Sequence, residues 1–267
     1  MTAVAALEVA QELADALGSG DADVVAGFAP RLADGARLVS IRGRREGRDD
    51  VVAGLADAGL LGMFGQATWS PPTVGDDGTR VEMRATVPAA LPVGGFDVTL
   101  QFDGDGQVQE IHQQMLPPAP LEPTPLALGD DVRDLLAGAL SNRTPTIVAY
   151  VAPDGRPHVS LRATTQLLGP DRIGMWIRDP SGGLLAGIAA NPNLTIWYRD
   201  PEARTNYQFY GRARRDDDER VRAEVFDHSP EPEQNMDPSR RGVAVVVDLD
   251  RVEGSGPSGR VLMVRDA

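Results

Sequence analysis

Five prolines between residues 116 and 125 divide the chain into two parts that have to fold separately. The segment reads LPPAPLEPTP. Each proline lacks a backbone N–H and restricts the residue before it, so this segment forms neither a helix nor a central strand. We expect an extended linker at residues 117–127 between a domain at residues 1–116 and a domain at residues 128–267.

The first half combines helical and extended patterns. Apolar residues recur at helical spacing over residues 7–17, and shorter helices are expected at residues 21–28 and 49–58, the latter capped by Asp49 or Asp50. Alternation of apolar and polar residues then predicts strands at residues 81–87, 96–102 and 107–116. Helices followed by strands predict an α+β domain with a curved antiparallel sheet.

Few side chains in the first half are suited to catalysis. The predicted inner strand faces hold Val, Met, Ala, Leu and Phe, and Asp97 falls on the opposite face. His112, with Glu110 and Gln114 on its face, is the one polar candidate. We therefore expect a small-ligand or dimerisation domain here.

The second half is rich in short strands. After a predicted helix at residues 129–140, residues 144–215 show the pattern of three strands, one short helix and two more strands. Ser181 is the expected cap of that short helix. A surface helix is expected at residues 216–227, followed by strands at residues 242–252 and 260–264. Many short antiparallel strands with few helices favour a barrel.

Two strands of this run place anion-binding side chains in a row. Alternation puts Ser160, Arg162 and Thr164 on one face of one strand, and Trp176 with Arg178 on one face of the next. A guanidinium binds phosphate through two hydrogen bonds. Such a row beside an aromatic ring suits a planar cofactor that carries a phosphate. The opposing interpretation is that both arginines pair with some of the many carboxylates.

Composition excludes several other functions. The chain has no Cys and no Lys, which excludes disulfides, thiolate catalysis, Cys-ligated metals and Schiff-base chemistry. We assign no metal site. The net charge of -13 disfavours nucleic acid and anionic membranes as partners. No basic leader precedes the first helix and no apolar run reaches the roughly 18 residues that span a bilayer, so we expect a cytoplasmic protein.

The second half resembles the pyridoxamine 5'-phosphate oxidase-like split barrels, which bind FMN or a deazaflavin. The resemblance covers about residues 128–255 and rests on the phrases DGRPHVSLRAT, IAANPNLTIWYRDPEARTNYQFYGRARR and RRGVAVVVDLDRVEG. It implies an antiparallel split β-barrel with the cofactor at a homodimer interface. The cofactor-binding residues that it implies are Ser160, Arg162, Thr164, Trp176, Arg178, Ser181 and Gly182.

The sequence departs from this family at one position of the site. Many members carry a basic residue in the first turn of the short helix, where it meets the phosphate. The corresponding sequence here is SGGLLAG, so Gly183 or Leu184 takes that place. One positive charge that would bind the phosphate is therefore missing.

The first half resembles the cone-shaped fold of nuclear transport factor two, the ketosteroid isomerases and the polyketide cyclases. The resemblance covers about residues 1–116 and rests on element order and on GDADVVAGFAPRLADGARL and GRDDVVAGLA. It implies a fold and carries little information about function.

Two functions follow from these patterns. The first is a flavin- or deazaflavin-dependent oxidoreductase that acts on a small organic substrate, with FMN as the leading cofactor and the catalytic residues unknown. The alternative is a non-catalytic small-molecule binding protein with a degenerate flavin site. Haem is the least favoured of these cofactors, because a lone histidine such as His158 usually does not coordinate a metal.

Overall fold

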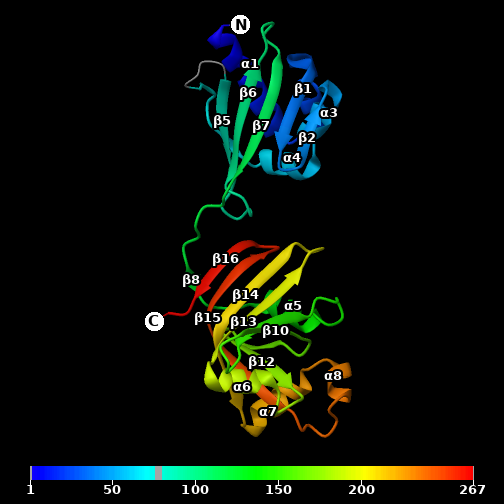
Figure 1. The fold of residues 1–267 in the computed structure, drawn as a ribbon, viewed down its shortest axis with the longest axis vertical. Helices are drawn as coiled ribbons and strands as arrows, with labels where there is room; N and C mark the ends of the chain where they lie inside the picture. The colour runs from blue at the N-terminus through cyan, green and yellow to red at the C-terminus, as the bar shows by residue number, and fades with distance from the viewer. Residues whose placement is uncertain (1, 76–79, 267) are drawn as a thin grey trace. The chain divides into compact units, whose positions relative to one another are not determined.

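The computed structural model describes residues 2–75 and 80–266 and shows a protein of the α+β class (Figure 1). Residues 1 and 267, which appear in the predicted domain limits, lie outside the described residues. The chain divides between Pro120 and Leu121 into two compact units, here called the first unit and the second unit. Each unit has its own sheet and its own apolar core.

The first unit packs helices against one face of a sheet. Its strands follow the order β2-β1-β7-β6-β5-β3, with β4 on β5. The elements are α1 (Ala3–Gly18), α2 (Ala22–Ala26), η1 (Ala29–Arg31), β1 (Leu32–Ser40), β2 (Gly43–Glu46), α3 (Arg48–Leu55), α4 (Ala58–Phe64), β3 (Thr68–Trp69), β4 (Thr73–Val74), β5 (Arg80–Thr86), β6 (Gly95–Phe102) and β7 (Val108–Leu116).

The first-unit sheet is mixed, whereas the sequence predicts an antiparallel one. The three predicted strands are confirmed as β5, β6 and β7, which pair antiparallel. The additional strand β1 pairs parallel with β7. Alternation does not predict β1 because Asp34 and Gly35 interrupt it and the register shifts between Leu32 and Arg37.

The predicted helix at residues 49–58 corresponds to α3, which ends at Leu55. Helix α3 begins after Gly47, whose φ of 96° favours glycine, so Asp49 and Asp50 lie in the first turn and neither is the cap. Helix α4 follows directly, and Asp57 caps it by accepting hydrogen bonds from the backbone N–H groups of Gly59 and Leu60 at 3.1 Å each.

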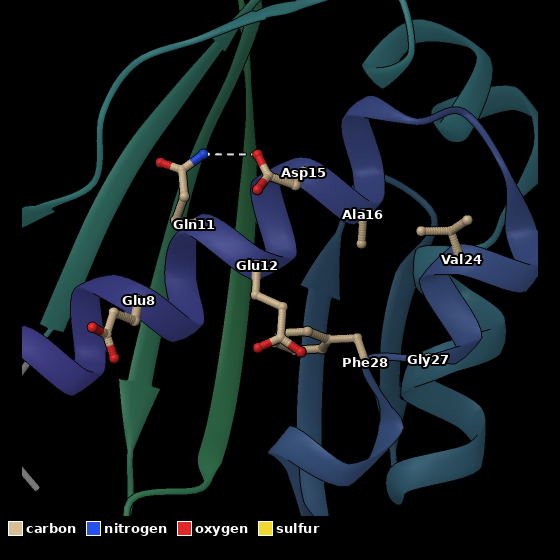
Figure 2. A pocket seen from close by; sticks show the side chains of 8 residues that line it. All are labelled: Glu8, Gln11, Glu12, Asp15, Ala16, Val24, Gly27 and Phe28. Carbon is tan, nitrogen blue, oxygen red and sulfur yellow. Dashed lines mark hydrogen bonds between the residues drawn. The ribbon is translucent and has the colours of Figure 1, made fainter.

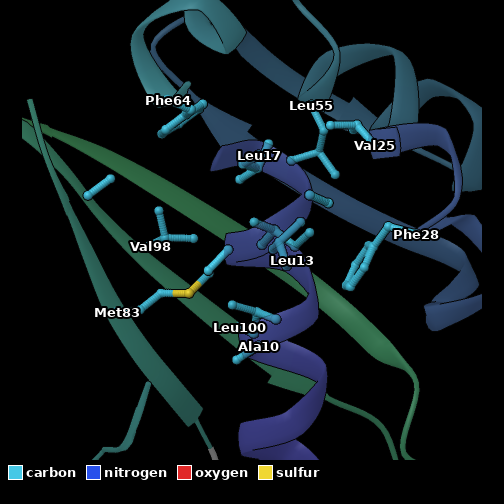
Figure 3. Packing of buried hydrophobic residues seen from close by; sticks show 14 of the residues in the cluster. Ala10, Leu13, Leu17, Val25, Phe28, Leu55, Phe64, Met83, Val98 and Leu100 are labelled. Carbon is cyan, nitrogen blue, oxygen red and sulfur yellow. The ribbon is translucent and has the colours of Figure 1, made fainter. Parts of the chain in front are cut away.

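The core of the first unit lies between α1 and the sheet. Figure 3 shows Leu13 and Leu17 of α1 directed towards Val98 and Met83 on the strands. Leu13, Leu17 and Val98 have no solvent exposure. Burying a side chain of this size contributes about 1.5–3 kcal/mol relative to leaving it exposed.

The second unit is built from one long sheet. Its strand order is β10-β9-β13-β14-β15-β12-β11, with β16 on β15 and β8 on β16. The elements are β8 (Thr124–Pro125), α5 (Asp130–Gly138), β9 (Thr146–Val151), β10 (Pro157–Arg162), β11 (Gln166–Gly169), β12 (Arg172–Ile177), α6 (Gly183–Ala190), β13 (Asn193–Asp200), β14 (Thr205–Asp216), α7 (Glu219–Asp227), α8 (Glu231–Asn235), β15 (Val243–Gly256) and β16 (Gly259–Val264).

This sheet curls back on itself. The two ends of its strand path, β10 and β11, are separated in sequence only by residues 163–165. Side-chain hydrogen bonds cross the junction: the Thr164 hydroxyl donates to the Trp176 carbonyl at 3.0 Å, and the Thr146 and Thr165 hydroxyls lie 2.6 Å apart. The result is a barrel left open between β10 and β11.

Two segments of the second unit differ from their predicted roles. Thr124 and Pro125, expected in the linker, form β8 and pair with β16 at the sheet edge, where a proline is tolerated. Helix α7, expected on the surface, buries Val225 and Phe226 against Trp176. The sequence does not indicate this because a mostly polar helix shows only a short apolar stripe.

Candidate anion-binding site

Two polar side chains on β10 carry buried atoms without partners. Ser160 and Arg162 share one face of β10, opposite Val148 and Thr146 of β9. The Oγ of Ser160 and the Nε of Arg162 are buried and form no hydrogen bond. Nη1 of Arg162 donates to the carbonyl of Leu161 at 2.8 Å. Since buried polar groups are nearly always hydrogen-bonded, these two atoms make Ser160 and Arg162 the candidate ligand-binding residues of the second unit.

The environment of Arg162 favours the binding of an anion. Burial is the main cause that lowers the pKa of Arg162; nearby Arg178 lowers it further, while Tyr150 and Glu233 oppose the shift. A guanidinium nevertheless keeps its charge in a protein. Arg162 is therefore a partly desolvated cation close to a second cation. We call Tyr150, Ser160, Arg162, Arg178 and Glu233 the arginine cluster.

Tyr150 of β9 lies against α6, and the strand pattern does not predict it as a site residue. Its ring stacks on His158 with the centroids 5.6 Å apart. A Cβ on Gly183 would lie 3.2 Å from the Tyr150 hydroxyl oxygen, and one on Gly187 would lie 2.5 Å from the ring. The glycines let α6 approach Tyr150 closely. Only the pairing of Tyr150 with His158 could have indicated this position.

Arg178 has a carboxylate partner that the sequence did not identify. Its Nε lies 3.5 Å from Oε2 of Glu233 on α8, and its Nη1 lies 3.1 Å from Sδ of Met236. Among the described residues, no carboxylate lies within ion-pair distance of Arg162. The interpretation that both arginines pair with carboxylates therefore holds for Arg178 only.

Thr164 and Trp176 are engaged in contacts within the chain. The Thr164 hydroxyl donates to the carbonyl of Trp176 and accepts from its backbone N–H at 3.1 Å. The Trp176 side chain is only 3% exposed, lies edge-on to Phe226 and donates its indole N–H to Asp237 at 3.0 Å. Trp176 thus presents no open ring face, because α7 covers the strand face that the sequence leaves open.

Ser181 and Gly182 form the turn before α6. The cap of α6 is Gly182, so the prediction that Ser181 caps this helix is wrong. Both the backbone N–H and the hydroxyl of Ser181 donate to Oδ1 of Asp179, at 2.9 and 2.7 Å. Of Gly183 and Leu184, the two residues in the first turn of α6 where the sequence comparison expects a basic side chain, Leu184 is buried in the core.

The interior of the first unit holds an unpartnered amide. Gln113 of β7 is 3% exposed, and neither its Nε2 nor its Oε1 forms a hydrogen bond. The indole Nε1 of Trp69 is likewise buried without a partner. His112, the expected candidate, is exposed on the other face of β7, and the same face carries the Asp97–Arg84 ion pair at 2.6 Å.

The first unit carries grooves on its surface. One of about 590 Å³ lies between α1 and α2, and it is lined by Glu8, Glu12 and Asp15 from α1 and by Val24 and Phe28 from the other side (Figure 2). Glu12 is paired with Arg31 at 2.9 Å. Within residues 2–75 and 80–266, no three His, Asp or Glu side chains gather in a way that could hold a metal ion. No helix in the same ranges is long and apolar enough to cross a membrane.

Comparisons with known proteins give structural neighbours only. No protein-family profile matches the chain, and no curated protein matches its sequence. HupZ of Group A Streptococcus is 16% identical, with a TM-score of 0.39, over 50% of this chain and 98% of its own. An FMN-binding protein from Syntrophomonas wolfei is 11% identical, with a TM-score of 0.38, over 47% of this chain and 84% of its own.

A third neighbour comes from Clostridium acetobutylicum and is related to general stress protein 26, of the pyridoxinephosphate oxidase family. It is 10% identical, with a TM-score of 0.36, over 49% of this chain and 95% of its own. A likeness at this level identifies neither a cofactor nor an activity.

Proposed function

We propose that the second unit binds a flavin-type cofactor, FMN or a deazaflavin, through its phosphate at the arginine cluster, and that the protein is an oxidoreductase acting on a small organic substrate. The observation that carries this proposal is the pair of buried, unpartnered atoms on β10, Ser160 Oγ and Arg162 Nε. A hydroxyl and a guanidinium are donors that suit phosphate oxygens.

The residues present fit a phosphate group. Arg162 would bind it and offset its charge, Ser160 would donate one hydrogen bond, and the first N–H groups of α6 lie beside Tyr150, with Gly183 leaving room for close approach. The cofactor supplies the redox chemistry when bound. The chain's own residues hold and orient it, so no side-chain acid or base is required. We assign Thr164, Trp176, Ser181 and Gly182 no contact with the phosphate, because the polar side-chain atoms of the first three already have partners within the chain.

We also propose that two copies of the chain associate through the outer face of β9, β10 and β13. Val159 and Leu161 are 70% and 63% exposed, and they alternate with Ser160 and Arg162 along β10. The register continues this apolar face from Leu161 through Ile147 to Trp197. None of these residues is charged, so repulsion between two chains of net charge -13 is weakest here. This face lies on the opposite side of β10 from Ser160 and Arg162.

The phosphate assignment is tested by titrating FMN into the wild-type protein and two variants. We expect Arg162→Ala to weaken FMN binding by tenfold or more, about the contribution of one charge-assisted hydrogen bond. The matched control is Arg156→Ala in the same hairpin, where Arg156 is exposed and lies 3.7 Å from Asp154. The control should bind FMN like the wild type. Equal affinity in all three proteins would refute the assignment.

A second candidate function concerns the first unit, for which we propose a cone-type fold that receives a small ligand. The observation that favours it is Gln113, whose amide is buried without a partner among apolar residues. An amide offers one acceptor and two donors, so it suits a neutral ligand that carries both kinds of group. Screening neutral amides and apolar molecules by thermal shift, with Gln113→Leu as the insensitive variant, tests this function.

A further inference from the structure

Glu233 places a negative charge inside the arginine cluster. Its Oε2 lies 3.5 Å from Nε of Arg178, and its side chain is 19% exposed. It is also close enough to Arg162 to oppose the lowering of that residue's pKa. Glu233 therefore interacts with both arginines that are proposed to hold the phosphate.

The backbone that carries Glu233 is fixed by other contacts. Its neighbour Gln234 donates hydrogen bonds from Nε2 to the carbonyls of Ser229 and Asp227, at 2.8 and 3.1 Å. Asp237, two residues after α8, accepts from the backbone N–H of Gly242 at 2.8 Å. Because both ends of α8 are held, the Glu233 carboxylate stays near any anion that binds Arg162.

The charges of the cluster sum to a single positive charge. Arg162 and Arg178 contribute two positive charges and Glu233 one negative charge. A phosphomonoester such as FMN brings almost two negative charges near neutral pH. Its phosphate must share Arg178 with Glu233 and is repelled by that carboxylate, whereas a neutral flavin is not affected.

We propose that Glu233 is the internal counter-ion of this site: it pairs with Arg178 in the absence of ligand, competes with the phosphate for that arginine, and so sets which ligand charge the site accepts. This inference rests on the proposed function and adds a specificity-determining residue to it. Glu233 is not a catalytic residue, because its effect is exerted through the charge of the site.

The test compares FMN with riboflavin, which has the same ring system and no phosphate. We expect Glu233→Gln to bind FMN on the order of tenfold more tightly than the wild type, and riboflavin with unchanged affinity. The matched control is Glu231→Gln on the same helix, since Glu231 is exposed and has no ion-pair partner among the described residues. The control should match the wild type for both ligands. Unchanged FMN affinity in Glu233→Gln would overturn the inference.

A second measurement distinguishes a counter-ion role of Glu233 from a purely structural role. Without ligand, Glu233→Gln leaves two arginines close together with no negative charge, so its Tm should fall. Inorganic phosphate should restore that Tm, while sodium chloride at equal ionic strength should not. A fall in Tm that phosphate does not reverse would show that Glu233 has only a structural role and would contradict the proposal. Glu233→Ala removes the same charge and serves if Glu233→Gln fails to fold.

The outcomes distinguish the two proposals. If the wild type prefers FMN to riboflavin and Arg162→Ala removes the preference, the phosphate site stands, and the Glu233 variants then decide the inference alone. If neither the wild type nor Glu233→Gln discriminates FMN from riboflavin, both the proposed function and this inference fail.

Discussion

The indole N–H of Trp176 donates a hydrogen bond of 3.0 Å to Oδ2 of Asp237, a residue 61 positions later in the chain. Asp237 also accepts from the backbone N–H groups of Arg241 and Gly242, at 3.0 and 2.8 Å. These bonds hold the segment with α7 and α8 against the outer face of β12. They position Glu233 beside Arg178 and cover Trp176.

Replacing Asp237 should destabilise the second unit in a pH-dependent way. Burial opposes the charged form of Asp237, but the hydrogen bonds from Gly242, Arg241 and Trp176 outweigh it and lower its pKa below the ordinary value. Asp237→Asn turns an acceptor into a donor facing donors, which costs about 1–3 kcal/mol. Urea unfolding at neutral pH measures this cost.

The sign of the pH effect follows from the lowered pKa. The stabilisation by Asp237 is fully present above the unfolded-state value of about 3.9 and is lost as pH falls through the folded-state pKa. The difference in the free energy of unfolding between wild type and Asp237→Asn should thus shrink below about pH 4. A difference that stays constant into acid would contradict the role assigned to this carboxylate.

Leu161→Glu should prevent self-association without unfolding the chain. Leu161 is 63% exposed and lies on the apolar outer face of β10, so a charge there costs the isolated chain little but repels a second copy. Sedimentation equilibrium should show a dimer for the wild type and a monomer for the variant. Val24→Glu, at an exposed apolar residue of the first unit, is the control and should remain a dimer.

Gln113→Leu should stabilise the ligand-free first unit. The buried amide of Gln113 has lost its hydrogen bonds to water and gained none, so an apolar side chain of similar size should raise the free energy of unfolding on the order of 1 kcal/mol. Chemical unfolding measures the change. A large loss of stability would show instead that the amide is satisfied inside the fold.

Gly187→Ala should destabilise the second unit. A Cβ at this position would lie 2.5 Å from the Tyr150 ring and 3.1 Å from the carbonyl of Val151, so α6 or Tyr150 has to move, at a cost of about 1–3 kcal/mol. Gly62→Ala in α4 is the matched control, because nothing lies within 4 Å of its added Cβ. The control should be neutral or stabilised by about 0.4–1 kcal/mol.

The sequence predicts strands better than it predicts what covers them. Alternation correctly places Ser160 with Arg162 on one face of β10, and Asp97 opposite the core, because side-chain direction has a period of two. It places Trp176 with Arg178 on one face of a strand but cannot show that α7 packs on Trp176. That contact depends on residues about fifty positions later in the chain.

The side chains that contact the site residues could not be predicted from the sequence either. Glu233 is one of many acidic residues, and nothing in its neighbourhood distinguishes it before α8 folds beside Arg178. Gln113 faces the interior because β7 changes register after Val108, which shifts His112 outward. A bulge of one residue reverses the faces, and alternation alone does not locate it.

The most direct measurement of the central claim is the ratio of the dissociation constants of riboflavin and FMN for the wild-type protein, followed by flavin fluorescence. If Arg162 and Ser160 hold a phosphate, FMN should bind at least about tenfold more tightly than riboflavin, and Arg162→Ala should bring the ratio close to one. Equal binding of the two flavins, or binding of neither, would contradict a phosphate site on β10.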